Sequence, residues 1–203
     1  MLPWMHLHAF PDGRAYPCCF AQDKHPVGDL NKNSISEVFN NDKMKTIRKN
    51  MLAGVKNKEC VKCYDQEESG FFSLRHSSNK HFGHNIKLTD STTAEGASKF
   101  IIKYWDIRFS NLCNFACRSC GTWFSSNWYE DHIKITGSPP KHAKIMRVGR
   151  SSNDIWEQML EHFDSVEQFY FAGGEPIIME EHYRILKELD KRKMYCLLYT
   201  SDA

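Results

Sequence analysis

Seven of the eight cysteines in this chain of 203 residues stand in three close groups. This grouping constrains the fold strongly, because thiols that share one centre must be brought together by the elements that carry them. The groups are the pair Cys18 and Cys19, the pair Cys60 and Cys63, and the triplet Cys113, Cys117 and Cys120. The eighth, Cys196, stands in the apolar run MYCLLYT, and we expect it in the core, where a free cysteine behaves as a small hydrophobe.

The composition indicates a globular protein and points to no macromolecular partner. Hydrophobic residues make up 41% of the chain, charged residues 26%, and the net charge is +2. Without a dense basic tract, nothing indicates nucleic-acid or membrane binding. The N-terminal MLPWMHLHAFPDG lacks the pattern of a secretory signal, and no run approaches the roughly 20 apolar residues of a membrane helix. We therefore expect a cytoplasmic protein whose cysteines serve metal or redox chemistry rather than disulfides.

The first third of the chain predicts a hairpin followed by helices that carry cysteines. Residues 4–17 alternate, turn at PDG and resume as RAYP, which predicts a β-hairpin ending at Cys18 and Cys19. His6 and His8 alternate on its first strand, and we expect each to be a surface or hairpin residue rather than a ligand. Ser34 and Glu37 have the spacing of a capping box. A second helix is expected over about 42–52, with Gly54 just beyond its end, before CVKC.

The second half of the chain predicts strands that alternate with helices. Strands are expected in FIIKYWDIRFS, SVEQFYFAGGEP and MYCLLYT, and helices in WFSSNWYEDHIKI, EEHYRILKELDKRK and SSNDIWEQMLEHF, the last capped by Ser152 or Asn153. This order is typical of βαβ units and a parallel sheet, so the fold class is α/β. The polar segment between the halves has little periodicity and is interpreted as a connector.

The triplet has the spacing C-x3-C-x2-C, which can turn several thiolates toward one point. A cubane iron-sulfur cluster suits this arrangement, because each of its four irons takes one ligand and iron favours thiolate. Three cysteines would leave one iron open. Two alternatives remain on residue chemistry: a zinc ion completed by a fourth ligand such as His132, and three unrelated core cysteines.

A second motif, GGEP at residues 173–176, follows the next predicted strand. Because the carboxyl ends of parallel strands meet at one edge, we expect GGEP and the triplet close together. Gly173 and Gly174 would let the backbone approach a ligand, and Glu175 would accept a hydrogen bond from an ammonium group. The alternative is a glycine turn that carries a solvated glutamate.

Together, LCNFACRSC and FAGGEP resemble the radical S-adenosylmethionine (radical SAM) superfamily. The resemblance implies that Cys113, Cys117 and Cys120 ligate a [4Fe-4S] cluster, and that the amino and carboxylate groups of SAM chelate the open iron. It further implies that the SAM amino group is held by Gly173, Gly174, Glu175 and Pro176. Reductive cleavage of SAM would give a 5′-deoxyadenosyl radical that abstracts hydrogen from a substrate. Ser119 departs from the pattern, since many members have an aromatic residue there.

The first third resembles the SPASM/twitch auxiliary-cluster domain of many radical SAM enzymes. The resemblance rests on PDGRAYPCC, VGDLNKNSISEVFN and MLAGVKNKECVKCYDQEESG. It implies a second cluster held by Cys18, Cys60 and Cys63, with Cys19 as the nearest fourth ligand; a zinc site of the same four residues is the alternative. In relatives this domain usually follows the barrel, and a further cysteine commonly precedes the PW dipeptide. Our hypothesis is that such a cysteine precedes this chain and that Cys19 is not the native fourth ligand.

The expected organisation is a small α+β twitch-type domain over 1–75, a connector over 76–99, and a partial radical SAM (β/α) barrel over 100–203. About three barrel strands are expected where the family usually has six, so we interpret the chain as a fragment with an exposed sheet edge. The expected function is that of a radical SAM enzyme whose reductant is a flavodoxin or ferredoxin and whose substrate, by analogy, is a peptide or protein. The alternatives are a zinc-binding structural module and a two-cluster electron carrier.

Overall fold

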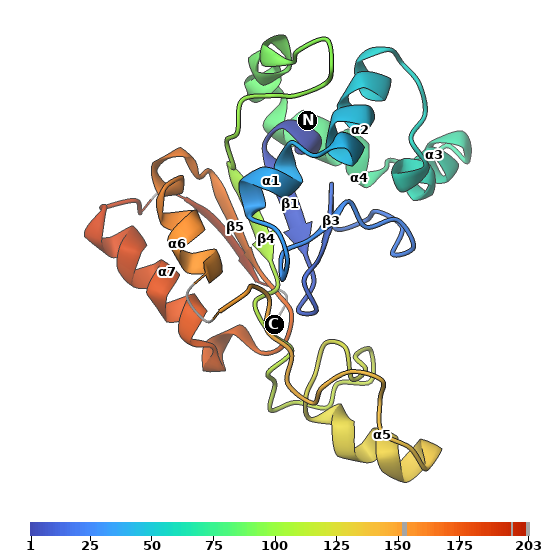
Figure 1. Ribbon diagram of the computed structural model, residues 1–203, viewed down its shortest axis with the longest axis vertical. Coiled ribbons are helices and arrows are strands. Elements are labelled where there is room, and N and C mark those ends of the chain that lie inside the picture. Colours follow the sequence, from blue (N-terminus) through green and yellow to red (C-terminus); the bar gives the residue numbers. More distant parts are fainter. Residues whose placement is uncertain (152–153, 196, 202–203) are drawn as a thin grey trace.

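A six-stranded mixed sheet forms the centre of the computed structural model, which describes residues 1–151, 154–195 and 197–201 (Figure 1). The strand order is β3-β2-β1-β4-β5-β6. The expectations for Cys196 and for a cap at Ser152 or Asn153 lie outside the described residues. The strands are β1 (His6–Ala9), β2 (Arg14–Tyr16), β3 (Gly28–Asp29), β4 (Tyr104–Ile107), β5 (Gln168–Phe171) and β6 (Leu198–Ser201).

The predicted hairpin and the predicted parallel sheet are both present. β1 and β2 pair antiparallel, and β4, β5 and β6 run parallel to one another. β1 also pairs parallel with β4, with His6 opposite Tyr104 and His8 opposite Asp106. The edge of β4 is therefore covered by the N-terminal hairpin, and the two halves of the chain share one mixed sheet.

The N-terminal helices follow the local signals of the sequence. They are α1 (Ile35–Phe39), which begins with the predicted capping box at Ser34, and α2 (Asp42–Leu52), after which Gly54 adopts a positive φ of 71°. The turn η2 (Lys58–Cys60) and α3 (Val61–Glu68) carry the second cysteine pair, and η1 (Leu2–Trp4) precedes β1. The buried Arg48 of α2 donates to the carbonyls of Pro3 (2.8 Å) and Phe39 (2.7 Å), which ties η1 and α1 to α2.

The segment interpreted as a connector contains regular structure that its polar composition did not predict. α4 (Leu74–Phe82) begins at Ser73, whose hydroxyl accepts from the His76 amide, and η3 (Gly83–Ser91) follows. Phe82 is buried, and its ring stacks on that of Tyr104 with centroids 5.5 Å apart. Tertiary packing of one aromatic residue thus supports a helix in which apolar periodicity is weak.

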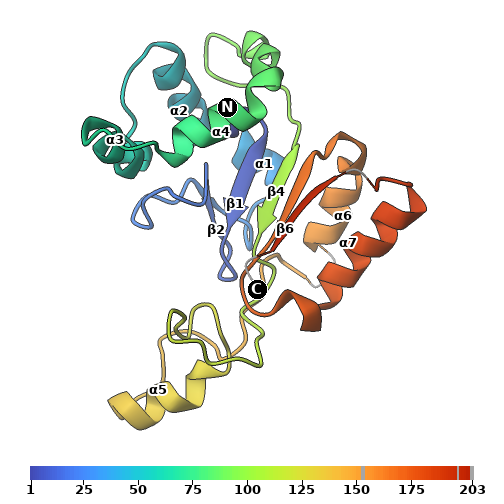
Figure 2. The same cartoon turned by 180° about the vertical axis from the view of Figure 1, so that it is seen from behind.

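The remaining helices lie beside the parallel strands, except for one. α6 (Asp154–Leu160), η4 (Phe163–Ser165) and α7 (Glu180–Lys191) lie beside β5 and β6, whereas α5 (Trp128–Thr136) belongs to a lobe that extends away from the sheet (Figures 1 and 2). The helix predicted from residue 123 begins only at 128. No described helix combines the length and apolar character needed to cross a bilayer.

The two faces of the sheet differ in chemistry because side chains alternate along each strand. One face is apolar: Leu7 and Ala9 of β1, Trp105 and Ile107 of β4, and Phe169 and Phe171 of β5 belong to one buried cluster. The same cluster includes Ile35, Val38 and Phe39 of α1, Ile155 and Met159 of α6, and Ile185 of α7. The alternate positions on the other face carry His6, His8, Tyr104 and Asp106.

Candidate functional site

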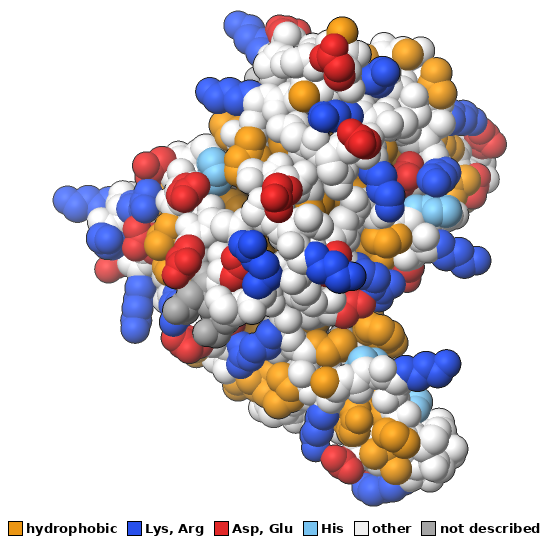
Figure 3. Space-filling model, viewed as in Figure 1, with side chains coloured by type: hydrophobic (Ala, Val, Ile, Leu, Met, Phe, Trp, Pro, Cys, Tyr) orange, Lys and Arg blue, Asp and Glu red, His pale blue; other side chains and the backbone are white. Residues whose placement is uncertain are grey.

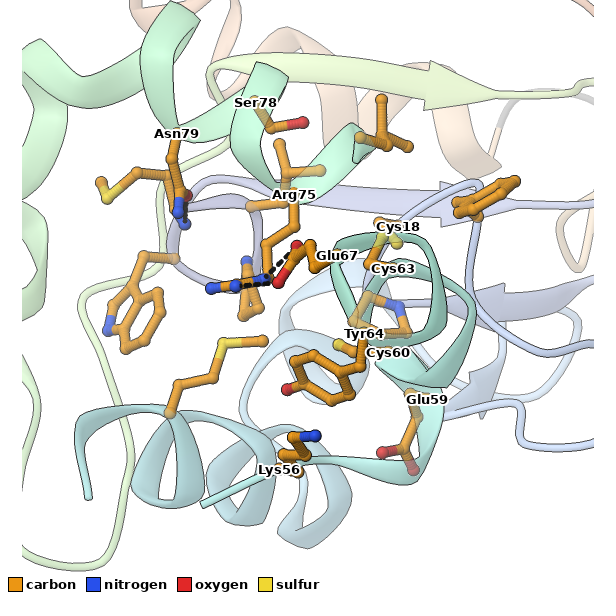
Figure 4. A pocket seen from close by; sticks show the side chains of 18 of the residues that line it. Cys18, Lys56, Glu59, Cys60, Cys63, Tyr64, Glu67, Arg75, Ser78 and Asn79 are labelled. Atoms are coloured by element: carbon orange, nitrogen blue, oxygen red, sulfur yellow. Dashed lines mark hydrogen bonds and ion pairs between the residues drawn. The ribbon is translucent and has the colours of Figure 1, made fainter. Parts of the chain in front are cut away.

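Three of the four N-terminal cysteines line one cavity of about 910 Å³ (Figure 4). Cys18 reaches it from the segment after β2, and Cys60 and Cys63 reach it from η2 and the first turn of α3. The spacing of three residues places these two cysteines on one side of a helical turn. The three residues predicted as the principal ligands of an auxiliary cluster therefore line one cavity.

Cys19 does not line this cavity. The residue as a whole is exposed, although its sulfur is partly enclosed, and the groups that act on that sulfur include Asp106 and Arg108 of the β4 region as well as Cys63. Burial of the sulfur, with Asp106 adding to the effect, raises the pKa of the Cys19 thiol to about 11. Cys19, the predicted fourth ligand, therefore does not line the cavity that the other three cysteines line.

The thiols around the cavity offer soft ligands in a largely apolar environment. Burial raises the pKa of Cys18 above its ordinary value and that of Cys60 to about 11. Because metals bind the thiolate form, occupation of this site would release protons. Within residues 1–151, 154–195 and 197–201, no three His, Cys, Asp or Glu side chains are grouped so that they could hold one metal ion. Cysteines that surround a wide cavity suit a group of several metal atoms better than a single zinc ion.

The triplet lies in a loop at the carboxyl end of β4, as predicted. Cys117 is exposed, and Cys113 and Cys120 are partly buried. Hydrogen bonds hold the loop: the Cys113 amide donates to the Ser126 hydroxyl (3.1 Å), and the Trp128 indole donates to the Cys117 carbonyl (2.9 Å). The backbone that carries the three cysteines is therefore held by hydrogen bonds, and all three thiols are accessible to a bound group.

The buried Asn111 anchors this loop, a role that sequence reasoning did not assign. Its amide nitrogen donates to the carbonyls of Thr122 (3.0 Å) and Lys144 (3.1 Å), and its amide oxygen accepts from the Met146 amide (2.8 Å). Asn111 thereby closes residues 112–145 into one lobe. Hydrophobic side chains gather on this lobe, at the bottom of Figure 3. Within residues 112–145, Phe115, Trp123, Ile135 and Ile145 are each 42% exposed or more.

The GGEP motif lies directly against the triplet loop. The Gly174 amide donates to the Ser110 carbonyl (2.9 Å), and the Glu175 amide donates to the Leu112 carbonyl (2.9 Å). A Cβ added to Gly174 would lie 1.9 Å from the Leu112 oxygen, and one added to Gly173, whose φ is +117°, would lie 2.7 Å from the Ser110 oxygen. Only glycine allows this approach, so the structure brings the two predicted motifs together.

The acidic residue of GGEP has a local role in the structure. One Glu175 carboxylate oxygen accepts from the Ile177 amide (3.1 Å) and caps η5 (Pro176–Ile178), in which Pro176 is buried. Glu175 itself remains partly exposed. A carboxylate fixed at this edge can accept from a cationic group of a ligand.

A buried polar array occupies the other face of the sheet beside these motifs. Asp106 and His8 form a pair at 2.9 Å, and each is at most 1% exposed. Burial opposes ionisation of Asp106, but His8, with weaker help from His6 and Arg108, keeps its pKa below the ordinary value. The Arg108 guanidinium lies 5.3 Å from the Phe10 ring and 5.1 Å from the ring of Phe124 in the triplet lobe.

His6 and His8 lie in the hairpin, as predicted, but they are not surface residues. His6 is 0% exposed and His8 is 1% exposed, and both lie on the face of the sheet that carries Tyr104 and Asp106 of β4. The His6 ring stacks on Tyr104 with centroids 4.4 Å apart, and its Nε2 has no hydrogen-bond partner among the described residues. Alternation alone could not find this, since it does not say which strand will pair with the outer edge of a hairpin.

Burial of His6 predicts a loss of stability in mild acid. Desolvation lowers the pKa of His6 to about 4, although Asp106 acts in the opposite direction. The unfolded chain takes up this proton near pH 6.5 and the folded chain only near pH 4, so the unfolding free energy should fall as the pH drops through this window, by about 3 kcal/mol. Urea unfolding at several pH values should show this fall in the wild type and a weaker one in His6→Phe. His132→Gln, on α5, is the control; equal pH dependence in the wild type and His6→Phe would contradict the prediction.

Comparison with known protein families matches residues 1–64 to SPASM, an iron-sulfur cluster-binding domain. Comparisons with curated proteins and with solved structures gave no match. The matched segment contains all four N-terminal cysteines and ends directly after Cys63. The N-terminal third of this chain is therefore similar to an iron-sulfur cluster-binding domain of a kind typically found in radical SAM enzymes.

Proposed function

We propose that this chain is part of a radical SAM enzyme that carries an auxiliary iron-sulfur cluster. The observation that carries the proposal is the junction of the triplet loop with GGEP, where two backbone hydrogen bonds join Gly174 to Ser110 and Glu175 to Leu112. The iron-sulfur domain at residues 1–64 supports it independently. The cysteine triplet would leave one metal position open for a carboxylate or an amine. The glycine-lined edge beside it offers Glu175 as an acceptor for an ammonium group. The two together fit a cofactor that has both an ammonium and a carboxylate group.

In this proposal each part of the site has a separate task. Cys113, Cys117 and Cys120 hold a [4Fe-4S] cluster, and Gly173, Gly174, Glu175 and Pro176 hold the amino group of SAM. When bound, cluster and SAM supply a reductive cleavage that yields a 5′-deoxyadenosyl radical. Asn111 fixes the loop, and the two glycines set its distance from β5. The sheet of which β4, β5 and β6 form a part corresponds to the beginning of a (β/α) barrel.

The auxiliary cluster in this proposal is held by Cys18, Cys60 and Cys63. Their cavity is wide and largely apolar, with room for a group of several metal atoms. A flavodoxin or ferredoxin supplies the electron, and the substrate is a peptide or protein.

Reconstitution tests the proposal directly. The protein, expressed from its complete reading frame, is loaded anaerobically with iron and sulfide, and its iron, sulfide and zinc are measured. It is then reduced with dithionite in the presence of SAM. We expect iron and sulfide equivalent to two clusters, and 5′-deoxyadenosine as a product. Two clusters without any 5′-deoxyadenosine would instead favour an electron carrier, and stoichiometric zinc without iron would favour a structural module.

A further inference from the structure

Two side chains beside the N-terminal cysteines have no assigned role, although they line the same cavity (Figure 4). Tyr64 directly follows Cys63 in α3. Arg75 belongs to α4, at the end of the expected twitch-type domain (1–75), and it lies outside the residues matched to the iron-sulfur domain. Both bring polar groups to a cavity whose walls are otherwise mostly apolar.

The Arg75 guanidinium is held firmly at the cavity. Its Nε donates to one carboxylate oxygen of Glu67 (3.0 Å), and its Nη2 pairs with the other. The Ser73 hydroxyl also donates to Glu67, so the carboxylate is itself fixed. The guanidinium lies 5.6 Å from the centroid of the Tyr64 ring. Arg75 lines the same cavity as Cys60 and Cys63, so its charge faces the space between these cysteines.

The Tyr64 hydroxyl keeps its hydrogen free for an acceptor in the cavity. Its oxygen accepts from the Asn57 amide (3.3 Å), which leaves the hydroxyl hydrogen for another acceptor. Tyr64 lines the cavity together with Cys60 and Cys63. A hydroxyl donor and a guanidinium at one cavity can both stabilise negative charge on the sulfurs of a group bound there.

We propose that Tyr64 and Arg75 set the reduction potential of the cluster held by Cys18, Cys60 and Cys63, Tyr64 through its hydroxyl and Arg75 through its charge. This rests on the auxiliary cluster of the proposed function and does not depend on SAM chemistry. Reduction adds one electron to the cluster, and the potentials of such clusters depend on net charge and on hydrogen bonds to their sulfurs. Removal of Arg75 also leaves the negative charge of Glu67 unpaired near the cluster. This charge opposes the addition of an electron, so it too lowers the reduction potential.

Redox titration of the auxiliary cluster alone tests this proposal. The background is the full chain with Cys113, Cys117 and Cys120 changed to alanine, so that one cluster remains. Tyr64→Phe removes only the hydroxyl, Arg75→Met removes the charge, and Arg75→Lys retains it. The matched controls are Tyr129→Phe on α5 and Arg150→Met, since Arg150 makes a comparable two-point contact with Asp154 outside the cavity. The midpoint potential is followed by electron paramagnetic resonance, with iron content measured for every variant.

We expect Tyr64→Phe and Arg75→Met to keep the cluster and to lower its midpoint potential. In each of these two variants the equilibrium constant for one-electron reduction should fall roughly tenfold, which corresponds to a decrease of about 59 mV in the midpoint potential. Arg75→Lys and both controls should stay near the parent value. Unchanged potentials in loaded Tyr64→Phe and Arg75→Met would overturn the proposal. Loss of the cluster from both Arg75 variants, with retention in Arg150→Met, would show that Arg75 supports the fold. This result would overturn the proposal that Arg75 sets the reduction potential. Failure of the parent background to bind iron would overturn the auxiliary cluster itself.

Discussion

Substitution of Cys117 by alanine is expected to abolish formation of 5′-deoxyadenosine while leaving the protein folded. The side chain is exposed, and the contact that holds this part of the loop is made by the Cys117 backbone carbonyl, which alanine retains. Loss of one of three thiolates removes a ligand that the remaining polar residues of the loop do not replace. Iron content should fall to about half, because the cluster at Cys18, Cys60 and Cys63 is separate. Iron analysis, product assay and thermal unfolding check these three results.

Cys19→Ala is the matched control for this experiment. It also removes one thiol, but Cys19 does not line the N-terminal cavity, so iron content should stay at the wild-type level. Loss of the auxiliary cluster from Cys19→Ala would contradict the separation of Cys19 from Cys18. Full iron and full product in Cys117→Ala would contradict the role proposed for the triplet.

Substitution of Gly174 by alanine is expected to damage both stability and activity. The added Cβ would lie 1.9 Å from the Leu112 oxygen, so the backbone of GGEP must move away from the triplet loop. Overpacking of this kind costs up to about 3 kcal/mol in folding free energy. Displacement of a binding edge by about 1 Å can reduce a reaction about 10²-fold, and we expect a loss of that order in 5′-deoxyadenosine formation. Urea unfolding and the product assay measure the two effects.

Gly121→Ala is the control for Gly174→Ala. Gly121 directly follows Cys120, yet a Cβ there would meet nothing within 4 Å, and its φ is not in the left-handed range. This variant should keep wild-type stability and product formation. A Gly174→Ala protein as active as Gly121→Ala would show that the tight junction between the two motifs is not required.

Local signals in the sequence predicted much of the fold. The capping box at Ser34, the end of α2 near Gly54 and the strand before GGEP were all found in short stretches of sequence. Such features depend on neighbours along the chain. Close placement of the triplet and GGEP was also predictable, because it follows from a general property of parallel sheets.

The features that could not be predicted depend on contacts between distant residues. Burial of His6 and His8 requires β1 to pair with β4, about 98 residues away, and nothing in the pattern of β1 indicates that partner. α4 is supported by Phe82 on Tyr104, and Arg48 finds its acceptors in η1 and α1. The cavity lined by Arg75 and the N-terminal cysteines could not be inferred for the same reason. The spacing of the cysteines identified them as candidate ligands, but only the tertiary structure shows that Cys18 lines the cavity and Cys19 does not.

The parallel pairing of β1 with β4 sets how the two cysteine sites can be spaced. Cys18 follows the hairpin that begins with β1, and Cys113 follows β4, so a hydrogen-bond ladder rather than the intervening chain connects the two sites. The distance between them is then a property of strand register. A shift of β1 against β4 by one residue would turn the residues of the shifted strand to the opposite face and change the distance between the two sites.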